Sequence, residues 1–139
     1  MILPQPESGM VVRYSYLWAS EANAGREDGS KDRPCAIILT ARDVAGQTRV
    51  QILPITHSPP SKADDAVEIP TPVKQHLRLD DERSWVLLSE YNEFMWPGHD
   101  LRPIGKTDSP VYGFFPQKFF GYLTSRFLAR QNHTATKRT

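Results

Sequence analysis

The sequence has a single cysteine, Cys35, among 139 residues, and this excludes an internal disulfide and any metal site built from several thiolates. It also lacks a long apolar run. Residues 1–6 carry no basic segment and no apolar stretch, so we expect neither a signal peptide nor a membrane span. The net charge is only +1, so total charge alone does not demand a nucleic-acid partner. These absences favour a cytoplasmic protein.

What is present is an ordinary globular composition interrupted by proline. Hydrophobic residues make up 39% of the chain, charged residues 24%, and there are 12 prolines. Because proline interrupts helices and inner strands, this composition favours short strands joined by loops. The length predicts one domain over residues 1–139, with a core at about residues 9–130. The tail, 131–139, is expected to be flexible and basic.

Hydrophobic alternation is the main indication of structure. Val12, Tyr14, Tyr16 and Trp18 share one face of an expected strand, and the polar segment 20–32 is typical of a long exposed loop. The fully apolar run that contains Cys35 predicts a buried strand, with the thiol acting as a small hydrophobic group. Strand-like patterns recur at residues 10–18, 35–41, 48–56, 66–69, 84–90 and 101–104.

Two segments indicate helices. Thr71 and Pro72 predict the start of a short mid-chain helix. Pro116 opens a second helix, whose apolar positions predict one buried face. Those positions are Phe119, Phe120, Leu123, Phe127 and Leu128. The aromatic-rich segment 91–100 is expected to be a loop. The predicted fold is mainly β, a small SH3-like antiparallel barrel with a mid-chain helix and a C-terminal helix.

Three segments, in this order and spacing, resemble the MazF/PemK family of toxins. Residues 32–39 (DRPCAIIL) are similar to the family's Arg-Pro entry into its second strand, and residues 50–56 (VQILPIT) to the strand that ends in Ile-Thr. Residues 84–90 (SWVLLSE) are similar to a hydrophobic strand that closes on an acidic residue. The resemblance spans about residues 9–129.

The resemblance implies a metal-independent endoribonuclease that cleaves single-stranded RNA through attack by the ribose 2′-hydroxyl. It further implies a homodimer, inhibition by a cognate antitoxin protein, and no cofactor. Two features depart from the family pattern. The loop 20–32 is long and charged, and Leu88 stands where some PemK-like members have a catalytic arginine.

Four residues are candidates for the chemistry. Arg33 takes the position of the family's catalytic arginine, and a guanidinium can hold two phosphate oxygens at once. The Thr56 hydroxyl can donate to a phosphate oxygen. His57 is the residue type that titrates near neutral pH, so it can exchange a proton. Glu90 matches an acidic position that acts as a base in some relatives. For each, a purely structural role remains open, such as an ion pair, a strand end or an exposed loop.

Further residues are candidates for RNA binding. Tyr91 and Trp96 can stack on unpaired bases, although core packing or a dimer contact is the more common role for such residues. The polar candidates are Arg26, Lys31 and Ser58. No metal is assigned, because His76 and His99 lack a metal-ligand spacing with each other or with Cys35.

Two other functions stay open. CcdB-like relatives share the fold and act on DNA gyrase through a protein contact, in which case Arg33 and Thr56 would belong to the scaffold. A non-catalytic SH3-like binding module is the other alternative, and its peptide groove would be lined by aromatic residues such as Trp18 and Trp96.

Overall fold

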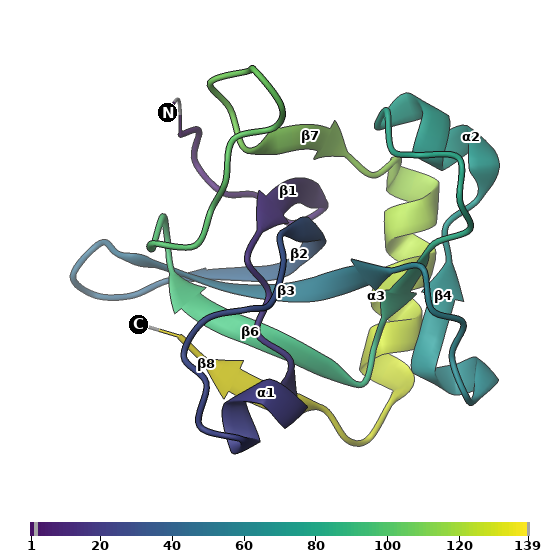
Figure 1. Ribbon diagram of the computed structural model, residues 1–139, viewed down its shortest axis with the longest axis horizontal. Coiled ribbons are helices and arrows are strands. Elements are labelled where there is room, and N and C mark those ends of the chain that lie inside the picture. Colours follow the sequence, from purple (N-terminus) through teal and green to yellow (C-terminus); the bar gives the residue numbers. More distant parts are fainter. Residues whose placement is uncertain (2, 139) are drawn as a thin grey trace.

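The computed structural model describes residues 1 and 3–138 and contains a single, mostly antiparallel sheet with three α-helices (Figure 1). The elements, in chain order, are β1 (Met10–Tyr14), α1 (Ala19–Asn23), β2 (Arg33–Arg42), β3 (Thr48–Thr56), the 3₁₀ turn η1 (Ala63–Asp65), β4 (Ala66–Glu68), α2 (Thr71–His76), β5 (Trp85–Leu87), β6 (Glu90–Met95), β7 (Val111–Phe114), α3 (Gln117–Ala129) and β8 (Thr134–Lys137).

The strand order is β4-β5-β3-β2-β1-β7. On the side away from β2, strand β3 pairs with two strands, β6 and β5. Its first half pairs with β6, and its last two residues pair with β5. The predicted hairpin of β2 and β3 is confirmed, with Cys35 opposite Pro54 and Arg42 opposite Thr48. The mainly β character is therefore confirmed. The sheet path itself is open, ending at β4 and β7.

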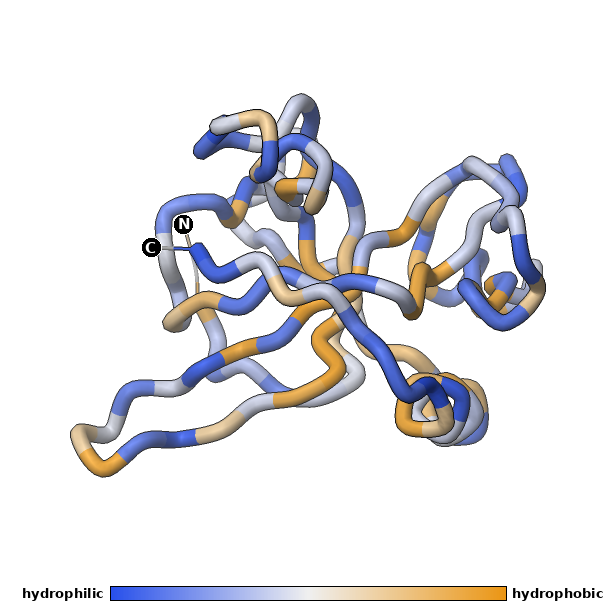
Figure 2. Tube along the Cα trace, turned by 90° about the horizontal axis from the view of Figure 1, so that it is seen from below, coloured by the Kyte–Doolittle hydropathy of each residue, from blue (hydrophilic) through white to orange (hydrophobic). Residues whose placement is uncertain are grey.

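Each face of the sheet carries one hydrophobic cluster, because side chains alternate along the strands. The first cluster joins the sheet to α2 and α3 through residues such as Leu53, Val73 and Leu123. The second contains the aromatic face predicted for β1, with Tyr14 and Tyr16 fully buried. Figure 2 shows the β2–β3 hairpin extending beyond these clusters as a long arm.

Three expectations about strands and loops are corrected by the structure. The segment expected as a loop from residue 91 is strand β6 as far as Met95, and its Asn92 is buried. The segment 101–104 is not a strand, since Leu101 forms only an isolated bridge with Tyr14. The loop 20–32 contains the end of helix α1. In α3, Leu123 and Phe127 are buried as predicted, but Leu128 is exposed.

The basic tail also differs from the flexible segment that we expected, although Thr139 lies outside the described residues. Strand β8 pairs in parallel with β6. Arg138 follows it, and its side chain is only 4% exposed, 3.1 Å from Asp100. Its guanidinium also donates to Asn92 Oδ1 and to the carbonyl oxygen of Ser15. These partners compensate the buried charge, so the end of the chain is held against the sheet.

No helix among the described residues is long and apolar enough to cross a membrane.

Candidate functional site

Arg33 is a buried cation at the start of β2, and its charge is poorly compensated. The residue is 9% exposed, and its Nη1 donates to the carbonyl oxygen of Ile55 over a long 3.5 Å. The guanidinium lies over the Trp18 ring, 4.8 Å from the centroid. Within residues 1 and 3–138, no carboxylate lies within ion-pair distance of it, and its buried Nε has no hydrogen-bond partner. A buried charge is costly without partners, so this guanidinium is well placed to receive an anion.

Thr56 lies at the end of β3, beside Arg33. Cys35 pairs with Pro54, so continuing this register by two residues places Arg33 opposite Thr56. Directly opposed residues of an antiparallel pair project to the same face. The Thr56 hydroxyl oxygen accepts a hydrogen bond from the Ser58 backbone N–H over 3.1 Å, and its own proton stays available to a ligand. Arg33 and Thr56 are therefore brought to the same face at adjacent strand ends.

A cavity of about 300 Å³ opens next to these strand ends. Its lining residues are Arg13, Lys31, Asp32, Arg33, Pro34, Ile55, His57, Arg78, Leu79, Asp80 and Tyr112. Four arginines and lysines face two aspartates in this lining, so two positive charges are in excess even with a neutral histidine. Thr56 is not among the lining residues. The cavity wall is cationic, which suits an anionic ligand larger than a single phosphate group.

Arg78 is held in this wall by an unusual backbone conformation. Its φ is +57°, in the left-handed region that costs a residue with a Cβ about 1–2 kcal/mol. The cause is the end of α2. The backbone N–H of Leu79 donates to the Lys74 carbonyl, and that of Arg78 to the Gln75 carbonyl. Glycine is the usual residue at this position after a helix. Here an arginine takes it and adds a cation to the cavity.

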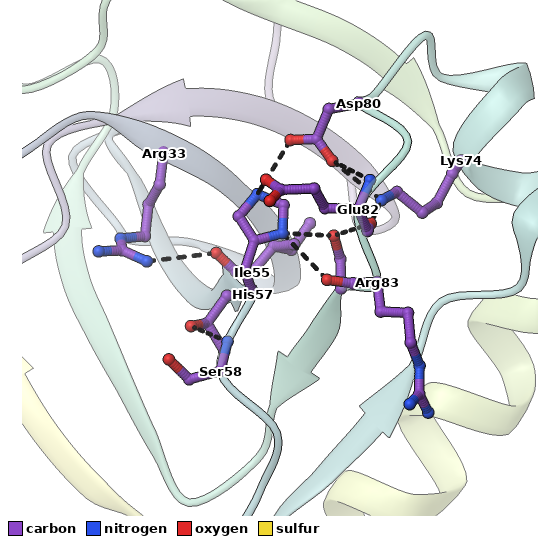
Figure 3. A network of polar contacts seen from close by, with 10 residues as sticks. Arg33, Ile55, His57, Ser58, Lys74, Asp80, Glu82 and Arg83 are labelled. Carbon is purple, nitrogen blue, oxygen red and sulfur yellow. Dashed lines mark hydrogen bonds and ion pairs between the residues drawn. The ribbon is translucent and has the colours of Figure 1, made fainter.

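His57 is fixed by contacts at both ring nitrogens (Figure 3). Nδ1 lies 3.0 Å from the carbonyl oxygen of Arg83 and 3.3 Å from the Ser84 hydroxyl oxygen, and because the carbonyl can only accept, the shorter contact favours a proton on Nδ1. Nε2 lies 2.9 Å from Asp80 Oδ2 and 3.4 Å from Glu82 Oε2. With both nitrogens engaged, neither is free to take a proton from a substrate. This geometry argues against the acid–base role that we expected for His57.

Lys74 contacts both acidic residues that surround His57. It is buried, and its ammonium donates to Asp80 Oδ1 over 3.1 Å and to the carbonyl oxygen of Glu82. Burial alone would raise the pKa of Asp80, but the Lys74 hydrogen bond and the charge of His57 outweigh it and lower that pKa. Asp80 is therefore held as a carboxylate, with one oxygen on Lys74 and the other on His57.

Glu90 lies away from the cavity, behind the aromatic side chains of the second cluster. Its Oε1 accepts hydrogen bonds from the Tyr16 hydroxyl and from the Ala19 backbone N–H, each over 3.0 Å. Burial raises the pKa of Glu90. Tyr16 packs edge-on against Trp18, which in turn lies under Arg33. Glu90 therefore hydrogen-bonds to Tyr16, which packs against the Trp18 ring beneath Arg33, and it does not line the cavity.

The residues expected to bind RNA are scattered. Lys31 lines the cavity, whereas Arg26 forms an ion pair with Glu21 beside a different hollow. Tyr91 packs edge-on against Phe127 of α3. Trp96 stacks on Phe94, and its indole N–H donates to the Pro4 carbonyl oxygen. The backbone N–H of Ser58 donates to the Thr56 hydroxyl oxygen. The aromatic residues are engaged in packing, which was the structural role left open for them.

Several residues of this region were not predicted from the sequence. Arg13 and Arg78 line the cavity, and Lys74, Asp80 and Glu82 surround His57. The acidic run 80–82 was a usable signal, since it follows a helix end and precedes a strand. Nothing local indicates that it meets residue 57, because the pairing of β3 with β5 is what brings the two segments together.

Comparison of the chain with protein-family models, with curated proteins and with solved structures finds no match.

Proposed function

We propose that the protein is a metal-independent endoribonuclease that binds a phosphodiester of single-stranded RNA at Arg33 and Thr56. In the proposed reaction the ribose 2′-oxygen gives its proton to solvent water and attacks phosphorus. The bond from phosphorus to the 5′-oxygen breaks, and that oxygen takes up a proton from water. The products are a 2′,3′-cyclic phosphate and a 5′-hydroxyl end.

The observation that carries this proposal is the uncompensated burial of Arg33. Its Nε is unpaired but buried and its Nη1 is weakly bonded, so the two terminal nitrogens of the guanidinium are the donors for two phosphate oxygens. Negative charge builds up on those oxygens in the transition state, and fixed donors aimed at such charge often supply the largest share of catalysis. The Thr56 hydroxyl adds a third donor. Arg33 and Thr56 therefore stabilise charge, and the proposal assigns no proton transfer to His57 or Glu90.

The cationic cavity supports a substrate longer than one phosphate. Arg13, Lys31 and Arg78 line it together with Arg33, so neighbouring phosphates of an extended strand have cations to meet. The family resemblance extends the proposal to a cytoplasmic toxin on an SH3-like barrel. Such a toxin would act as a homodimer and be inhibited by an antitoxin that covers the cavity.

The test is cleavage of a mixed single-stranded RNA by purified protein in excess chelator, followed by analysis of the ends. We expect 5′-hydroxyl ends from the wild type and a loss of at least about 100-fold in rate for Arg33→Met. Arg33→Lys should also be impaired, because an ammonium keeps the charge but not the planar fork. Arg42→Met is the matched control, since Arg42 is exposed on the hairpin.

Intact RNA with the wild type, or unchanged cleavage by Arg33→Met, would overturn the proposal. Growth arrest that survives in Arg33→Met without any RNA cleavage would instead favour a toxin that acts by protein contact.

A further inference from the structure

Three potential ligand atoms converge on the outer side of the cavity. They are Nε2 of His57, a carboxylate oxygen of Asp80 and one of Glu82, and all lie within 4.8 Å of one another. We propose that this cluster is a binding site for a zinc-class divalent cation. The proposal goes beyond the nuclease function and does not depend on it.

The three ligand atoms lie near the spacing that a zinc ion requires. Zinc bonds of about 2.0–2.2 Å in a tetrahedral arrangement place neighbouring ligand atoms about 3.4 Å apart. Nε2 lies 2.9 Å from Asp80 Oδ2 and 3.4 Å from Glu82 Oε2. The Glu82 side chain is 75% exposed, so it can move inward without disturbing the core. Three protein ligands would leave a fourth position open to water or to a ligand in the cavity.

The orientation of the His57 ring is the independent observation. Nδ1 lies 3.0 Å from the Arg83 carbonyl oxygen, which favours a proton on Nδ1 and turns Nε2 toward the two carboxylates. A backbone carbonyl that accepts from the far nitrogen is the usual support of a metal-bound histidine. A bound cation would take the place of the Nε2 proton between the ring and the two carboxylates.

A contact with Lys74 orients the Asp80 carboxylate toward the proposed metal position. Lys74 holds Oδ1 over 3.1 Å and leaves Oδ2 to face His57. The same ammonium binds the Glu82 carbonyl oxygen, and the Glu82 backbone N–H donates to Asp80 Oδ1 over 3.1 Å. The loop that carries both carboxylates is therefore fixed before any ion binds. With the imidazole of His57 neutral, as a metal ligand must be, two carboxylates against one ammonium leave a net negative charge for a divalent cation.

Zinc titration of metal-free protein at pH 7.5, followed by calorimetry, tests the proposal. We expect saturable binding of one ion per chain and a loss of affinity of at least roughly tenfold in Glu82→Gln. This variant keeps every backbone contact of the loop. Asp81→Asn is the matched control, because Asp81 is an exposed neighbour outside the cluster, and it should bind zinc like the wild type. Magnesium, which favours an all-oxygen octahedral shell, should not compete at equal concentration.

A second measurement needs no variant. In nitrogen NMR of the wild type, zinc should shift the His57 Nε2 resonance while Nδ1 keeps its proton. The proposal is overturned if zinc does not saturate at one ion per chain, or if Asp81→Asn weakens binding as much as Glu82→Gln. Unmoved His57 signals at saturating zinc would also overturn it. The nuclease proposal is tested in chelator, so each can fail without the other.

Discussion

Replacing Arg33 by methionine should make the protein more stable while removing the proposed RNA cleavage. Methionine can follow the path of the aliphatic part of the arginine and fill the space against Trp18 without a charge. Exchanging a buried ionic group for a hydrophobic one stabilises proteins by about 1–4 kcal/mol when the charge is not well paired. The variant loses the stacking of the guanidinium on Trp18, which contributes about 0.5–2 kcal/mol. The lost hydrogen bond to Ile55 is at the 3.5 Å limit and contributes little.

The balance is a stabilisation of about 1–2 kcal/mol. For a chain of 139 residues this corresponds to about 3 °C in Tm per kcal/mol, so we expect Tm to rise by about 3–7 °C. Thermal and urea unfolding of wild type and Arg33→Met measure it. A nuclease-resistant oligonucleotide at about 100 times its Kd should stabilise the wild type alone, by about 2.7 kcal/mol. A fall of stability by 2 kcal/mol or more in the variant would refute the reasoning, because the guanidinium would then be part of the scaffold.

Three further substitutions test the roles of Arg138, Arg78 and Glu90. Arg138→Met should destabilise the protein by about 3–5 kcal/mol, measured by urea unfolding, because the largely buried Asp100 carboxylate is then left with Arg102 at 4.0 Å as its charged partner. Arg78→Gly should leave Tm nearly unchanged, since relief of the left-handed backbone offsets the added freedom of the unfolded chain. It should weaken RNA binding and reduce its salt dependence by about one counterion. Wild type should become more stable as pH falls from neutral toward 4.5, the ordinary pKa of Glu90, and Glu90→Gln should lose this gain.

The sign of the last effect follows from burial. The folded pKa of Glu90 is raised, so the folded state binds the proton more tightly than the unfolded state. The stabilisation is complete below the unfolded pKa and is lost as pH rises through the folded one. Equal pH profiles of wild type and Glu90→Gln between pH 4.5 and 6 would contradict this. An Arg138→Met variant as stable as the wild type, or an Arg78→Gly variant with unchanged RNA affinity, would contradict the other two.

The sequence predicted those strands and helices whose own residues carry a hydrophobic pattern. The β2–β3 hairpin and α3 follow from runs of alternating or helical apolar residues, and both are present at nearly the predicted bounds. Strand β8 could not be recognised in this way. Its sequence, Thr-Ala-Thr-Lys, has no hydrophobic pattern. It is a strand because β6 offers a free edge and because Arg138 is tied to partners more than 40 residues away.

The same distinction applies to the site. Arg33 and Thr56 end adjacent strands of one hairpin, so their proximity could be inferred from the expected pairing. The contacts of His57 with Asp80 and Glu82 join two loops, and they depend on β5 pairing with β3. The burial of Arg33 without a partner could not be read from the sequence either, because Asp32 is its neighbour in the chain and yet pairs with Arg13 and Arg102.

The proposed function requires the buried guanidinium of Arg33 to hold an RNA phosphodiester. Nitrogen NMR of the arginine Nε–H groups tests it most directly, with a single-stranded oligonucleotide of mixed sequence carrying 2′-O-methyl groups added to the wild type. We predict that the Arg33 Nε–H resonance shifts and that its exchange with water slows as the oligonucleotide saturates the protein. An Arg33 resonance that stays in place, while the signals of other residues shift on binding, would show that Arg33 does not hold the phosphodiester.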